Sequence, residues 1–128
     1  MSEAFRQKKS GGTRNTRRYP RYPVDLRVTG NIFRGGEMQS YWGRSTELGL
    51  DGIGATITGD LEVGEVVSME FSLPLSPQPL KLRAIVRYRS GLHYGFEFLT
   101  VKEEQRNTLR RVCQMLAASG ATATAWQP

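Results

Sequence analysis

The chain has 128 residues and a net charge of +6 at pH 7, from 18 basic and 12 acidic side chains. This length suits one domain with tails, and the single cysteine excludes an internal disulfide. No apolar stretch approaches the roughly 18 residues that a membrane-spanning helix needs. No apolar region follows the positive N-terminus, so we predict no signal peptide and expect a cytoplasmic protein.

The positive charge is concentrated at the N-terminus. Residues 1–21 hold seven basic side chains and one acid, Glu3, so residues 22–128 sum to zero. We predict a flexible basic arm over residues 1–16 and a flexible tail over residues 119–128, because both are poor in apolar side chains. A neutral domain with a cationic arm suits a small anion or an acidic surface better than specific nucleic-acid binding.

The segment Arg17-Arg18-Tyr19-Pro20-Arg21 precedes the first strand-like run. It gathers three guanidinium groups on a short stretch that proline stiffens. Guanidinium forks bind phosphate oxygens and the acceptor edge of guanine, so this segment is a candidate anion site. The alternative is a solvated basic linker.

Alternation of apolar and polar residues predicts six strands, with a turn region over residues 30–36. The expected strands cover residues 24–28, 38–46, 53–57, 66–73, 80–89 and 93–98. Short strands with no helix between them predict an all-β fold, an antiparallel sheet that closes into a six-stranded barrel.

One α-helix is predicted after the last strand. Thr100-x-x-Glu103 has the pattern of a capping box, and Leu109, Val112, Cys113 and Leu116 form one apolar stripe. The stripe predicts that the helix packs across an open end of the barrel. The folded domain is therefore expected to span residues 17–118.

A glycine-rich turn, Glu47-Leu48-Gly49-Leu50-Asp51-Gly52-Ile53-Gly54, lies between two predicted strands. Its glycines would let the backbone approach a ligand closely. The alternative is an ordinary strand connection whose glycines need positive φ.

These residues together resemble the PilZ family, small β-barrel receptors for the second messenger cyclic di-GMP. Arg17 and Arg21 match the family's Arg-x-x-x-Arg motif, and the turn that begins at Glu47 occupies the place of its Asp/Asn-x-Ser-x-x-Gly motif. The closing strands over residues 84–98 and the C-terminal helix also fit. The resemblance covers residues 17–118.

The resemblance implies a ligand site made of Arg17, Arg18, Arg21, Glu47, Gly49 and Gly52. The arginines would engage phosphates and guanine edges, and Glu47 would accept from guanine N–H groups. The sequence departs from the family motif twice, because Glu47 replaces Asp or Asn and Gly49 replaces Ser. Losing the serine hydroxyl removes a hydrogen bond of roughly 1.5–3 kcal/mol to a charged group, or roughly 10- to 100-fold in affinity.

Three functions follow as hypotheses. The first is a stand-alone receptor that binds cyclic di-GMP and relays it to a protein partner. The second is a degenerate PilZ-like adaptor that binds a protein without nucleotide. The third is a small-barrel nucleic-acid binder. We expect no enzymatic activity and no cofactor, because no paired-carboxylate, metal or nucleophile–base set can be assembled.

Overall fold

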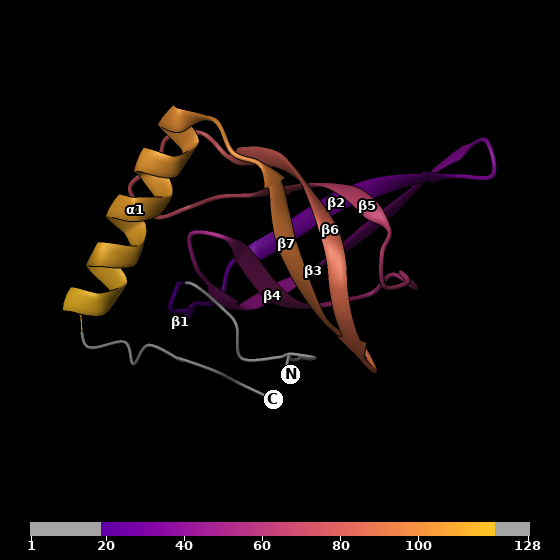
Figure 1. Cartoon of the computed structure of the whole chain (residues 1–128), viewed down its shortest axis with the longest axis horizontal. Helices are drawn as coiled ribbons and strands as arrows, with labels where there is room; N and C mark the ends of the chain where they lie inside the picture. The colour runs from indigo at the N-terminus through magenta and orange to yellow at the C-terminus, as the bar shows by residue number, and fades with distance from the viewer. Residues whose placement is uncertain (1–18, 120–128) are drawn as a thin grey trace, which may run out of the picture.

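The computed structural model describes residues 19–119, which form seven strands and one helix (Figure 1). The elements are β1 (Tyr22–Pro23), β2 (Arg27–Arg34), β3 (Glu37–Leu48), β4 (Gly52–Ile57), β5 (Val66–Phe71), β6 (Leu80–Ser90), β7 (His93–Thr100) and α1 (Glu103–Ala118). The predicted arm, Arg17, Arg18 and the tail beyond Ser119 lie outside the described residues. The predicted domain limits of 17 and 118 stay a prediction.

The strands form one antiparallel sheet in the order β1-β3-β2-β5-β6-β7-β4. An additional pairing between β3 and β4 closes six of them into a barrel, which confirms the predicted fold class. β1 stands outside this ring. It pairs with the end of β3, where Tyr22 lies opposite Leu48 and Pro23 lies opposite Glu47.

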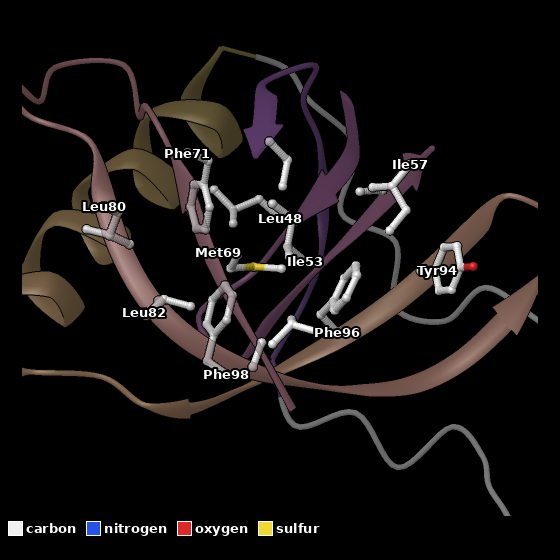
Figure 2. Packing of buried hydrophobic residues seen from close by; sticks show 14 of the residues in the cluster. Leu48, Ile53, Ile57, Met69, Phe71, Leu80, Leu82, Tyr94, Phe96 and Phe98 are labelled. Carbon is white, nitrogen blue, oxygen red and sulfur yellow. The ribbon is translucent and has the colours of Figure 1, made fainter. Parts of the chain in front are cut away.

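The barrel interior holds the apolar half of each alternating strand. Figure 2 shows the side chains of Met69, Phe71, Phe96 and Phe98 converging from β5 and β7. Tyr41 is buried among them, and its hydroxyl donates to the Ser68 carbonyl oxygen at 2.8 Å. Burial of this ring raises the pKa of Tyr41.

The helix packs at one end of the barrel, beside β1, and the β2–β3 hairpin projects at the opposite end (Figure 1). Leu109 and Val112 belong to the same buried cluster as the barrel interior. Cys113 is also buried, as the predicted apolar stripe requires. No helix in residues 19–119 is long and apolar enough to cross a membrane.

The predicted turn over residues 30–36 was too long. β2 continues to Arg34, and only Gly35 and Gly36 form the turn, with φ values of 60° and 82°. Gly30 lies within the strand, and a Cβ there would lie 2.1 Å from the Ser68 carbonyl oxygen and 2.4 Å from the Tyr41 hydroxyl oxygen. The tyrosine thus fills the space that a side chain at position 30 would take.

The predicted first strand and the helix cap were also displaced. Residues 24–26 are irregular, and the strand begins at Arg27, because the Ser45 hydroxyl replaces ladder bonds by donating to the Val24 carbonyl and accepting from the Leu26 N–H. Thr100 ends β7, so it does not cap the helix. Lys102 holds the N-cap position, and its backbone N–H donates to Gln105 Oε1 at 3.0 Å.

Candidate functional site

The candidate site lies where the chain enters the barrel. Arg21 directly precedes β1, and β1 pairs with Glu47 and Leu48 at the end of β3. The bend that follows is closed by a hydrogen bond from the Gly49 N–H to the Gly52 carbonyl oxygen at 3.0 Å. Strand pairing therefore brings Arg21, the last residue of the predicted arginine segment, into contact with the predicted glycine-rich turn.

Arg21 lies across this bend and is only 6% exposed. Its Nη1 is 3.6 Å from Glu47 Oε2, and its Nε donates to Asp51 Oδ1 at 3.2 Å. Glu47 is also buried, at 8% exposure. Burying these charged groups is tolerable because they lie close to opposite charges.

The two glycines of the bend make room for Arg21. A Cβ at Gly49 would lie 2.7 Å from Arg21 Cδ and 2.8 Å from the Pro20 carbonyl oxygen. A Cβ at Gly52 would lie 2.8 Å from Arg21 Nη2 and 2.2 Å from the Phe96 carbonyl oxygen. Both positions therefore require glycine for close approach.

The hypothesis that this turn needs positive φ was wrong. Within residues 19–119, the glycines with positive φ are Gly35, Gly36, Gly64 and Gly91, none of which lies in the bend. The bend instead uses glycine for space.

Of the six predicted site residues, the structure brings together Arg21, Glu47, Gly49 and Gly52. Arg17 and Arg18 lie outside the described residues. Sequence reasoning placed the negative charge of Asp51 near the turn but missed that Asp51 binds Arg21. No local signal was available, because no sequence pattern reports which way the Asp51 side chain points in the bend.

Two hollows flank the bend. An open pocket of roughly 410 Å³ lies beside it and is lined by Tyr19, Leu50, Asp51, Glu97, Phe98, Leu99, Val101 and Arg106. A smaller, more apolar hollow of roughly 200 Å³ separates the Tyr19–Tyr22 segment from the helix at Arg110, Cys113, Gln114 and Ala117. Tyr19 and Leu50 line both hollows, so the two hollows adjoin at the entry segment.

The pKa of Cys113, which lines the smaller hollow, depends on its surroundings at this junction. Burial raises the pKa of its thiol, and the negative charge of Asp51 adds to the effect. The thiol is therefore a poor nucleophile at neutral pH. This agrees with the predicted structural role of Cys113 in the apolar stripe.

The closed antiparallel barrel with a C-terminal helix is the fold of a known family of small domains. The model of the PilZ domain family matches residues 15–114, so the chain belongs to the PilZ family. This confirms the resemblance on which the predicted fold and site were based.

Solved structures share the fold. The inhibitor of motility from Bacillus subtilis, MotI/DgrA, is 17% identical with a TM-score of 0.64, over 81% of this chain and 52% of that one. The PilZ domain of Escherichia coli YcgR, solved with cyclic di-GMP, is 18% identical with a TM-score of 0.60, over 81% of this chain and 93% of that domain.

The chain spans about half the length of the longer relatives. It covers 52% of MotI/DgrA and 47% of the longer Escherichia coli YcgR chain, which was also solved with cyclic di-GMP. That YcgR chain is 20% identical with a TM-score of 0.64, over 81% of this chain. No curated protein matches the sequence closely enough to count as a relative.

Proposed function

We propose that this chain is a PilZ-type receptor that binds cyclic di-GMP at the junction of Arg17–Arg21 and the Glu47–Gly52 bend, and relays binding to a protein partner. The observation that carries the proposal is the position of Arg21, which lies directly over the bend. The segments that resemble the two motifs of the family are therefore in contact through Arg21. The receptor would act in the cytoplasm, as a binding domain without enzymatic activity.

Binding would exchange the partners of Arg21. Its guanidinium now lies against two carboxylates, and a phosphate oxygen can replace a carboxylate oxygen as acceptor with the same geometry. Arg17 and Arg18 would add further forks from the arm. The open pocket beside Asp51 is the available space for the ligand.

The same contacts limit the affinity. Glu47 and Asp51 compete with the phosphates for Arg21 and repel them. Gly49 lacks the family's hydroxyl, a loss of roughly 10- to 100-fold in affinity if that hydroxyl would bond a charged group. We therefore propose a receptor that binds more weakly than a domain with the full motif.

Calorimetric titration of the full chain with cyclic di-GMP tests the proposal. Heat should be released by the native protein and by the matched control Arg34→Ala, whose ion pair with Glu65 lies on a different part of the sheet. The double variant Arg17→Ala/Arg21→Ala should release none. Absence of heat from the native protein at high micromolar ligand rejects the receptor function.

The second candidate is an adaptor that binds a protein partner without nucleotide. The ion pairs of Arg21 with Glu47 and Asp51 favour it, because they supply the anions that a ligand would otherwise bring. Capture of one partner should then be unchanged by cyclic di-GMP and by Arg17→Ala. Capture that depends on the ligand supports the receptor instead.

A further inference from the structure

The outer face of the β2–β3 hairpin carries large apolar side chains. Phe33 and Met38 are cross-strand partners near its tip and are 67% and 61% exposed. Trp42 lies on the same face, opposite Thr29, and is 56% exposed. Aromatic side chains and methionine are enriched at protein interfaces, so their grouping on one projecting ribbon indicates a contact surface.

A shallow groove of roughly 730 Å³ continues this face across β3, β2, β5 and β6. Its walls combine Trp42 and small polar side chains with three cations and one acid: Arg27, Lys81, Arg83 and Glu70. The strand register places Trp42, Thr29, Glu70 and Lys81 in one row across the four strands. The apolar hairpin and the basic groove therefore form one continuous surface, which we call the groove face.

The cations of the groove face differ from the other sheet arginines. Four of those arginines are paired with carboxylates, in the pairs Arg34–Glu65, Arg44–Asp25, Arg87–Glu97 and Arg89–Asp60. In contrast, Arg27, Lys81 and Arg83 make no ion pair within residues 19–119. Glu70 offsets only part of their charge, so the groove attracts negative charge.

We propose that the groove face is the docking surface for an acidic segment of a partner protein that also carries apolar side chains. Its acidic residues would meet Arg27, Lys81 and Arg83, and its apolar residues would pack on Trp42 and the hairpin tip. This inference stands apart from nucleotide binding, because the groove residues do not include any residue of the bend.

Residues 1–18 and 120–128 do not have the composition of such a segment. Residues 1–18 contain six basic residues and a single acid, Glu3, and residues 120–128 contain no charged side chain. Neither end therefore complements the groove. Single-stranded nucleic acid would use the same cations and Trp42, but the exposed Met38 offers no ring for base stacking and suits a protein partner better.

A defined peptide tests the proposal. The full chain, labelled with ¹⁵N, is titrated with a synthetic amphipathic peptide of Glu, Leu and Phe, and amide shift changes are mapped. They should fall on β2, β3, β5 and β6 around the groove. The variant Arg27→Glu/Arg83→Glu should weaken binding by at least about tenfold, because each reversal turns attraction into repulsion.

The control reverses the same amount of charge elsewhere. Arg110→Glu/Arg111→Glu on α1 should change the affinity far less, since both side chains are exposed and lie outside the groove. Phe33→Ser/Met38→Ser should weaken binding without changing the fold, because both side chains are exposed.

Three outcomes would overturn the proposal. The first is equally tight binding of a peptide with Lys in place of Glu, or of an oligothymidylate of equal charge. The second is an affinity unchanged by Arg27→Glu/Arg83→Glu. The third is no binding of the acidic peptide at high micromolar concentration. None of these outcomes bears on cyclic di-GMP, whose binding is measured separately.

Discussion

The bend and the groove face differ in the burial and ion pairing of their cationic side chains. At the bend, Arg21 is buried and lies against Glu47 and Asp51. In the groove, Arg27 and Arg83 face solvent without an ion pair among residues 19–119. The sequence alone does not distinguish the buried, paired arginine from these exposed ones.

The difference separates two uses of arginine. A guanidinium enclosed by glycines and carboxylates stabilises the fold locally, and a ligand must displace its partners to use it. An exposed guanidinium without a carboxylate neighbour adds attraction for any acidic partner. A ligand at the bend must therefore displace the carboxylates from Arg21. An acidic partner at the groove meets cations that, among the described residues, have no carboxylate to displace.

The largest expected loss of stability is at Gly52, the bend glycine that packs against Phe96 of β7. Gly52→Ala places a Cβ 2.2 Å from the Phe96 carbonyl oxygen, so backbone must move. We expect a loss of about 3 kcal/mol or more in the free energy of unfolding by urea. Gly36→Ala is the control, because nothing lies within 4 Å there and the alanine would be strained only by the φ of 82°. Equal losses would show that the bend is not tightly packed.

The second largest loss of stability is expected when the buried guanidinium of Arg21 is removed. Arg21→Ala takes a charge partner from Glu47 and Asp51, and we expect a loss of roughly 2–3 kcal/mol in unfolding free energy. Arg34→Ala breaks a more exposed pair with Glu65 and should change stability little. If the two variants unfolded at the same urea concentration, the contrast between buried and exposed arginines would be lost.

Restoring the family's serine should not improve the domain by itself. In Gly49→Ser the new Cβ would lie 2.7 Å from Arg21 Cδ and 2.8 Å from the Pro20 carbonyl oxygen. We expect about 1–2 kcal/mol of destabilisation, measured by urea unfolding without ligand. In the double variant Gly49→Ser/Arg21→Ala the contact with Arg21 is gone, so the serine should lower stability less than it does alone. A stabilised single variant would contradict the packing described for the bend.

The smallest effect concerns Cys113. Burial and the charge of Asp51 raise the pKa of its thiol, so the folded state disfavours the thiolate. Stability should therefore fall as the pH rises from the ordinary thiol pKa, about 8.5, toward the raised value. Asp51→Asn should lower that pKa and speed alkylation by iodoacetamide a few-fold.

Asp25→Asn is the control for the thiol measurement. Asp25 is exposed and pairs with Arg44, whose hydrogen bond lowers the pKa of Asp25. It is not among the groups that shift the Cys113 pKa, so alkylation should not change. If both variants sped alkylation equally, the charge of Asp51 would not be what raises the pKa of Cys113.

The barrel and the helix could be predicted because alternation and the 3.6-residue stripe report burial directly. Met69, Phe71 and Phe98 hold apolar positions of the alternating pattern, and all three are buried. The extent of β2 could not be predicted, since Gly30 has the look of a turn glycine, whereas position 30 takes glycine because Tyr41 and the Ser68 carbonyl fill its side-chain space. Such a contact between strands has no local signal.

The location of the candidate site could be predicted from the sequence, but the contacts between its side chains could not. The resemblance to the PilZ family placed Arg21 and the glycine-rich turn in one site, and the two are in contact. The ion pair with Asp51 depends on which way a side chain turns in a bend, and no period reports that. Likewise, the groove cations could not be told from paired arginines, because pairing depends on the register between distant strands.

The most direct test of the central claim follows Arg21 itself. The Nε–H resonance of Arg21 is recorded by NMR in the full chain during titration with cyclic di-GMP. The account predicts a large, saturable shift as the guanidinium leaves Asp51 for phosphate, together with amide shifts over residues 47–54. A resonance that stays fixed while the ligand is added to high micromolar concentration would contradict it.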